Sequence, residues 1–134
     1  MTLALLIVAL LAPPAAPPEA APPAVTVVAI GAGTGLEDRT LVGVASKFPA
    51  TGEPVYVHAT LDNPGPGEAA ITFVWLHDGK EAWRTTHQVG KSPAWRSWTH
   101  KRMAKDAIGS WTVEVRAADG AVLHAVVFDV LAAG

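Results

Sequence analysis

Indole, guanidinium and ammonium groups are concentrated in one short stretch, Trp95-Arg96-Ser97-Trp98-Thr99-His100-Lys101. Arg96 and Trp98 share parity, so on a β-strand both side chains lie on one face. A guanidinium stacked on an exposed tryptophan contributes about 0.5–1 kcal/mol. The functional interpretation is an aromatic and cationic patch that binds a glycan or an anionic peptide. The structural interpretation, which we favour from the residue types alone, is a stacked pair whose arginine stem covers apolar surface.

The candidate binding residues are the rings and cations of this stretch and two side chains outside it: Trp83, Trp95, Arg96, Trp98, Lys101 and Arg39. Trp95 and Trp98 have opposite parity, so a regular strand leaves one of them exposed unless a bulge resets the register. Trp83 lies near a predicted hairpin and is a further candidate for an exposed ring.

Catalytic and metal-binding patterns are missing from the sequence. The chain has no cysteine, which excludes disulfides, thiolate metal sites and cysteine nucleophiles. The five histidines are not spaced as zinc ligands, and no serine lies in a G-x-S-x-G or S-x-x-K motif. A formal net charge of -2 does not indicate nucleic-acid binding. We therefore predict no enzyme activity, no cofactor, no metal and no nucleic-acid partner.

The glycines of Gly31-Ala32-Gly33-Thr34-Gly35 follow a β-branched run and suggest a dinucleotide fingerprint. The third glycine comes one residue too early for G-x-G-x-x-G, and residues 36–39 lead into another strand-like run rather than a helix. We reject nucleotide binding and predict a flexible or bulged connection here.

Period-two alternation identifies the strands that position the candidate patch. Val55, Val57, Ala59 and Leu61 should face a core while the residues between them face solvent. The alternation along the next segment predicts that Trp111, Val113 and Val115 also face the core. The apolar run around Trp75 indicates a central strand. Asp78-Gly79 and Asp119-Gly120 are hairpin signals.

These elements predict an all-β fold, an immunoglobulin-like antiparallel β-sandwich of seven or eight strands. We expect the segments 95–101 and 109–115 to form its central pair of strands. The sandwich should occupy residues 25–134, preceded by a signal-like helix and a Pro/Ala-rich linker.

The amino-terminal residues have the composition of an export signal. Residues 3–12 are an apolar run, about half the length that spans a bilayer. We predict a signal peptide or short N-terminal anchor over residues 1–20 and the end of the Pro/Ala-rich linker at 21–24. The mature domain would then be periplasmic or secreted and have no transmembrane span, with tethering by an uncleaved N-terminal segment as the alternative.

Several motifs in order resemble one bacterial family, DUF2914, a domain family of unknown function. They are Leu36-Glu37-Asp38-Arg39 followed by Val42-Gly43 and Phe48, then Val55-Tyr56-Val57, Val74-Trp75-Leu76-His77-Asp78-Gly79-Lys80, Trp95-Arg96-Ser97-Trp98 with Lys101, Gly109-Ser110-Trp111-Thr112-Val113-Glu114-Val115, and Gly120, Leu123 and Phe128. The chain departs from the family pattern at Thr40-Leu41 and at His100. The resemblance implies a compact β-rich domain of envelope or membrane-tethered proteins, and it implies no activity.

The function we predict from these features is that of an exported, non-catalytic interaction or accessory domain of the bacterial envelope. Its partner would be an envelope protein or a glycan. One alternative is a carbohydrate-binding module that uses Trp83, Trp98 and Arg96 as a stacking platform. A weaker alternative is a small hydrolase, which would need a pocket with convergent histidine and carboxylate groups.

Overall fold

The computed structural model describes residues 24–133, so the predicted signal or anchor at 1–20 and most of the linker at 21–24 lie outside the described residues. Within the described range the chain is almost entirely β-structure, with ten strands and one 3-10 turn. The elements are β1 Thr26–Gly33, β2 Gly35–Glu37, β3 Thr40–Val42, β4 Lys47–Pro49, β5 Pro54–Asn63, β6 Ala69–His77, β7 Lys80–Val89, β8 Ser92–Arg102, η1 Lys105–Ala107, β9 Gly109–Ala117 and β10 Val122–Leu131.

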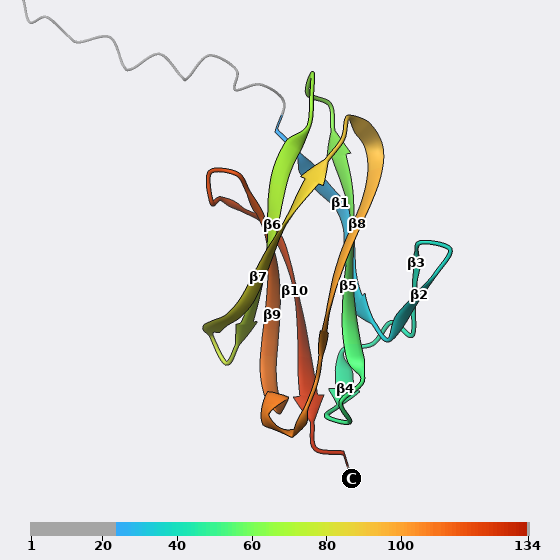
Figure 1. Ribbon diagram of the computed structural model, residues 1–134, viewed down its shortest axis with the longest axis vertical. Coiled ribbons are helices and arrows are strands. Elements are labelled where there is room, and N and C mark those ends of the chain that lie inside the picture. Colours follow the sequence, from blue (N-terminus) through green and yellow to red (C-terminus); the bar gives the residue numbers. More distant parts are fainter. Residues whose placement is uncertain (1–23, 134) are drawn as a thin grey trace, which may run out of the picture.

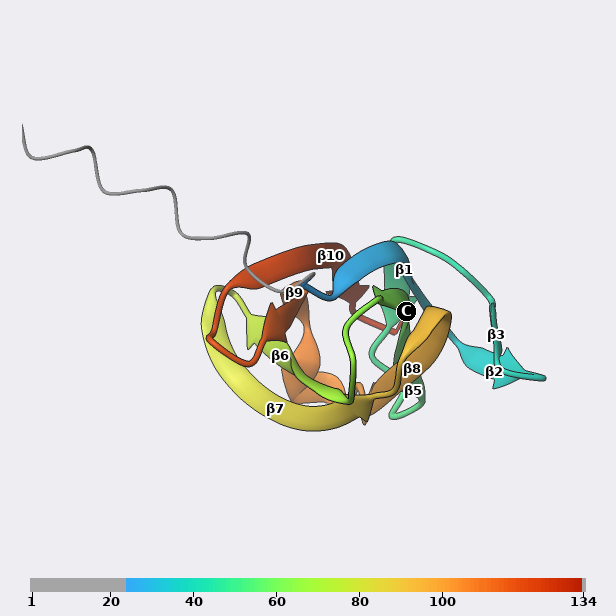
Figure 2. The ribbon, with the colours of Figure 1, turned by 90° about the horizontal axis from the view of Figure 1, so that it is seen from above.

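Two sheets lie side by side along the long axis of the molecule (Figure 1). One has the order β1-β5-β8 and the other the order β4-β10-β9-β6-β7. All pairs within them are antiparallel except β4 with β10. The hairpin β2-β3 stands away from the body of the molecule, on the side of β5 and β8 (Figure 2).

The inner face of the three-stranded sheet is built from small and aliphatic side chains. Val55, Val57, Ala59 and Leu61 of β5 are at most 2% exposed, which confirms the predicted alternation along this strand. The neighbouring strands add Ala32 from β1 and two small polar residues from β8, Ser97 and Thr99, all buried. Because few of these side chains are large, this face contributes little volume to the core.

The inner face of the five-stranded sheet supplies the bulk of the core. The rings of Trp75, Trp111 and Phe128 are fully buried and pack with centroids 6.2–6.3 Å apart. Trp111 donates a hydrogen bond from its Nε1 to the carbonyl of Ala107 at 2.7 Å, which satisfies its polar atom inside the core. The predicted inward orientation of Trp75 and Trp111 is therefore confirmed, and β6 lies between β7 and β9 as its apolar character indicated.

The predicted hairpin at Asp78-Gly79 is confirmed. Both residues have positive φ, 49° and 84°, which is the geometry of a type I′ turn. The carboxylate of Asp78 also accepts a hydrogen bond from the backbone amide of Ser110 at 2.9 Å, so the turn is anchored to β9. The second hairpin signal, Asp119-Gly120, lies in the connection between the paired strands β9 and β10.

The expectation that segments 95–101 and 109–115 form a central pair is wrong. β8 pairs with β5 at the edge of the three-stranded sheet, whereas β9 lies in the middle of the other sheet between β6 and β10. The connection at residues 103–108 contains the η1 turn and crosses from the three-stranded sheet to the five-stranded sheet. A connection without a two-residue turn signal leaves successive strands free to join different sheets.

Two further expectations for the amino-terminal half need correction. Gly31 and Gly33 belong to β1, so this stretch is not a flexible connection. A Cβ on Gly33 would lie 2.4 Å from the carbonyl oxygen of Val42, and only glycine permits such a close approach of the two backbones. The strand-like run expected after residues 36–39 is divided into β3 and β4. Seven strands of 8–11 residues are present as predicted, and three strands of three residues bring the described total to ten.

Replacement of Trp111 by alanine should lower the free energy of unfolding by about 3–5 kcal/mol, because a fully buried indole and its hydrogen bond are removed. Thermal and denaturant unfolding followed by circular dichroism would measure the loss. The matched control is Trp83→Ala, which removes a ring that is 40% exposed and should cost clearly less. Equal losses for the two variants would show that Trp111 does not anchor the core.

Candidate binding groove along strand β8

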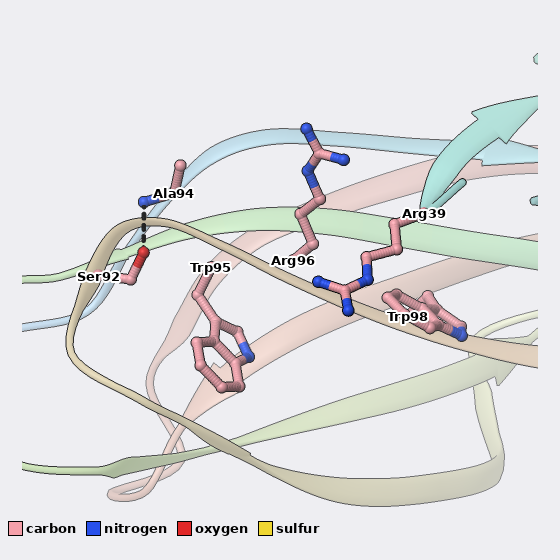
Figure 3. Close-up of a pocket in the computed structure, with 6 residues that line it drawn as sticks. All are labelled: Arg39, Ser92, Ala94, Trp95, Arg96 and Trp98. Atoms are coloured by element: carbon pink, nitrogen blue, oxygen red, sulfur yellow. Dashed lines mark hydrogen bonds between the residues drawn. The ribbon is translucent and has the colours of Figure 1, made fainter. Parts of the chain in front are cut away.

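A surface groove follows β8, with a volume of about 620 Å³ (Figure 3). We call it the β8 groove, and its lining residues are Arg39, Ser92, Ala94, Trp95, Arg96 and Trp98. Five of the six come from β8 itself, and Arg39 reaches it from the β2-β3 hairpin. Four of the six residues predicted from the sequence as candidates thus line one groove.

The lining side chains project from both sides of β8. Trp95 is paired with Leu61 of β5 and so lies on the core side of the sheet, where it remains 38% exposed at the end of the strand. Its ring packs over Gly90, where a Cβ would lie 2.8 Å from a ring carbon. Arg96 and Trp98 lie on the opposite, outer side, opposite Thr60 and His58. The predicted parity is therefore observed, and Trp95 is the more exposed of the two rings.

The outer face of the three-stranded sheet carries a ladder of stacked rings. His58 of β5 stacks on Trp98 with centroids 6.2 Å apart and planes 3° apart, and Tyr56 stacks on His100 at 4.9 Å. Figure 3 shows the guanidinium of Arg96 directed away from the Trp98 ring. The structural partner of Trp98 is therefore His58, and the Arg96 guanidinium is left available to a ligand.

Arg39 lies in the turn between β2 and β3, and this position places its side chain in the lining of the groove. Asp38 and Arg39 both have positive φ, 48° and 62°, so this tight turn resembles the one at Asp78-Gly79. A second hollow of about 360 Å³ lies between the hairpin and the sheet, and Arg39, Arg96 and His58 are among its lining residues. The two hollows therefore share both guanidinium groups.

Two of the three described arginines outside the groove are paired with carboxylates, and the third, Arg102, donates a hydrogen bond to the carbonyl of Gly52. Arg84 pairs with Glu81, and Arg116 pairs with Glu114. Within residues 24–133, Arg39 and Arg96 have no carboxylate within 4.0 Å. None of the lining residues of the β8 groove is acidic. The groove thus presents two guanidinium groups without a counterion from the described chain, beside two indole rings.

The remaining candidates lie elsewhere. Trp83 is on β7 and is 40% exposed, as expected, but its ring leans on Trp75 at 6.2 Å and lines neither hollow of β8 and the hairpin. Lys101 is opposite Val55 at the far end of β8, away from the groove. His58 was not predicted from the sequence as part of the site, because it lies on a different strand and only the β5-β8 register brings it against Trp98.

Two histidines near β8 have lowered pKa values. Burial is the main cause for His58 and the sole cause for His87; the charge of Arg96 lowers the pKa of His58 further, while a hydrogen bond with the backbone of Arg39 opposes the shift. Each has a buried Nε2 without a hydrogen-bond partner in the described structure. Burial therefore favours the neutral form of both rings in the folded protein.

No group of three or more histidine, cysteine, aspartate or glutamate side chains in residues 24–133 is arranged to hold a metal ion. The β8 groove instead offers donors: guanidinium N–H groups and the indole N–H groups. Such a set suits an acceptor-rich ligand.

Acidification should destabilise the domain through His58 and His87. Because their folded pKa values lie below the unfolded value of 6.5, the unfolded state binds more protons between the two, and the free energy of unfolding falls as pH falls from about 6.5 through the folded pKa. Denaturant unfolding between about pH 7.5 and pH 5 would measure this slope. His58→Phe keeps a ring beside Trp98 and should flatten the slope; an unchanged slope would exclude a contribution from His58.

Comparison with known proteins gives one family and a structural likeness. Residues 68–130 match the model of the family described as "Protein of unknown function (DUF2914)". This range holds the motifs of β6, β8, β9 and β10, whereas the motifs quoted before residue 68 lie outside it. A search of curated proteins gives no match.

Among solved structures, the chain is similar to the Pseudomonas fluorescens alkylpurine DNA glycosylase AlkC bound to DNA containing an abasic site analog. The TM-score is 0.55 at 13% identity, over 81% of this chain and 30% of that chain. The chain thus spans about a third of that protein, and the likeness concerns the fold alone. Within residues 24–133 no helix is long and apolar enough to cross a membrane.

The resemblance inferred from the W-R-x-W and G-x-W-x-V-x-V motifs is confirmed by this match: residues 68–130 of this chain are similar to the DUF2914 family.

Proposed function

We propose that this protein is an exported, non-catalytic interaction domain that recognises an anionic partner through the β8 groove. The observation that carries the proposal is the pair of guanidinium groups, Arg39 and Arg96, which face the groove without carboxylate partners in the described chain. Elsewhere in the same domain, Arg84 and Arg116 are paired with glutamates, and Arg102 donates a hydrogen bond to the carbonyl of Gly52.

The chemistry of these groups favours a carboxylate or a similarly acceptor-rich group. A guanidinium presents a rigid fork of N–H donors that matches a carboxylate in two parallel hydrogen bonds. Trp95 and Trp98 add apolar surface beside the charges, which lowers the local dielectric and strengthens the attraction. The chain as a whole has a net charge of -2, so this local excess of cations is not a consequence of overall composition.

A flat stacking platform for neutral sugars has less support from the geometry. Trp95 and Trp98 lie on opposite sides of β8, and Trp83 belongs to the other sheet, where it leans on Trp75 with planes 44° apart. The three rings therefore do not form one surface. A glycan would have to be recognised through acidic groups at the arginines.

We propose no reaction for the β8 groove. Ser92 is its one hydroxyl group, and that oxygen accepts a hydrogen bond from the amide of Ala94 at 3.0 Å in a local turn. The other polar groups that line the groove are guanidinium and indole N–H donors, which do not act as general bases near neutral pH. The family match to a domain of unknown function adds no sign of catalysis.

We also propose that the two sheets form an immunoglobulin-like sandwich. The strand sets are β1-β5-β8 and β4-β10-β9-β6-β7, and the chain changes between these sheets after β4, β5, β7 and β8, which supports the Greek-key pattern of that class. Trp75 on β6 takes the place of the buried tryptophan on the third long strand. The chain has no cysteine, so core packing has to replace the disulfide of antibody domains.

The proposal of export is supported by the amino-terminal sequence. An apolar run of residues 3–12 followed by an Ala/Pro tract is typical of a secretory signal and a spacer. The partner would then be an anionic protein or glycan of the envelope. Fractionation of cells that express the full chain would locate the domain.

Arg96→Gln and Arg39→Gln should each weaken binding of an anionic probe about tenfold or more, because each removes a charge-assisted hydrogen bond of about 1.5–3 kcal/mol. Suitable probes are a glutamate-rich peptide and oligogalacturonate at low salt, with binding followed by tryptophan fluorescence and calorimetry. Affinity should fall as salt is added, since the pairs are near the surface.

The matched control is Lys47→Gln, which removes one exposed cation from β4 on the other sheet and should leave the affinity unchanged. Cello-oligosaccharide serves as the neutral probe and should not bind. If neither anionic probe perturbs Trp95 or Trp98 at any salt concentration, the proposed function is wrong.

A further inference from the structure

β8 is an open edge of the three-stranded sheet. Its partner β5 lies on one side, and within the part of the chain that the structure describes no strand pairs with its other side. β7 precedes β8 in the sequence but belongs to the other sheet. The outer backbone N–H and C=O groups of this eleven-residue strand are therefore free to pair with an added strand.

Hollows lie along this open edge, and together they span both faces of β8. The β8 groove and a hollow of about 370 Å³ both include Trp95, Arg96 and Trp98, and the second reaches His87 and Gln88 on β7. A strand added to β8 would send alternate side chains to the two faces of the sheet. One set would meet Arg39 and Arg96 on the outer face, and the other set would meet Trp95 on the inner face.

The charge of the edge selects the occupant. β8 carries Arg96, Lys101 and Arg102 and has no acidic residue, and Arg39 adds a fourth cation beside it. Pairing of β8 with β8 of a second copy would bring like charges together, which disfavours a homodimer through this edge. An acidic strand would place opposite charges across the new ladder.

We propose that the β8 edge binds an extended acidic peptide segment of a partner protein by strand addition. Backbone hydrogen bonds to β8 supply part of the affinity, and carboxylates placed at every second residue pair with Arg39 and Arg96. This inference rests on the proposed recognition of an anionic partner and adds the backbone pairing. A glycan offers no backbone of this kind.

The test uses a peptide of alternating glutamate and threonine, about eight residues long, which is a common strand length. Two modified forms carry N-methyl groups on alternate amides, one on the odd and the other on the even residues, so that each form blocks one edge of the peptide strand. Charge and composition are the same in both forms, and each is the control for the other. Binding is measured by calorimetry on the full chain.

Strand addition predicts that one N-methylated form binds nearly as well as the unmodified peptide and that the other loses about tenfold or more in affinity. Amide hydrogen exchange of β8 should slow in the complex, while that of β7 should not change. If both N-methylated forms bind like the unmodified peptide, or if only oligogalacturonate binds, strand addition is wrong although anion recognition stands. If no anionic probe binds, both proposals fail together.

Charge reversal gives a second readout. The double variant Arg39→Glu/Arg96→Glu should no longer bind the glutamate peptide and should bind the lysine analogue of the same length. Both arginines are exposed, so the variant should fold, which circular dichroism verifies. If the double variant still prefers the glutamate peptide, the binding surface does not lie along β8, and the proposal is wrong.

Discussion

The packing of a layer of large rings against a layer of small side chains is the constraint on which this structure depends. Trp75, Trp111 and Phe128 fill the space between the sheets from the five-stranded sheet. From the three-stranded sheet, the inner face of β5 contributes the smaller side chains of Val57, Ala59 and Leu61. Because the volume of the core is supplied by one sheet, the inner face of the other can be small and, on β8, polar.

Apart from Trp95 at the end of β8, the bulky rings of the three-stranded sheet lie on its outer face, away from the core volume that the other sheet supplies. Tyr56, His58, Arg96 and Trp98 project outward, where they form the ring ladder and one wall of the β8 groove. The core and the candidate binding surface are thus two faces of the same pleated sheet. A shift of one residue in the β5-β8 register would exchange them and destroy both.

The electrostatic character of the groove follows from the same arrangement. Glu81 and Glu114 are on the five-stranded sheet, where they pair with Arg84 and Arg116. The hairpin that carries Arg39 approaches β8 from a different part of the chain and brings no carboxylate to the groove lining. Cations from two distant segments therefore line one groove without a carboxylate from the described chain, and the proposed recognition of an anionic partner rests on this arrangement.

The sequence by itself determined the strands whose patterns are local. Alternation along residues 55–61 and 111–115 predicted which side chains are buried, and Asp78-Gly79 predicted its hairpin, because side-chain parity and turn geometry depend only on neighbouring residues. The family motifs of β6 to β10 were likewise readable. Tertiary structure alone decided that β8 is an edge strand, that His58 lies against Trp98, and that Arg39 lines the same groove as Arg96. These relations depend on which sheet each strand joins and on its register, and both are fixed by the packing of the whole core.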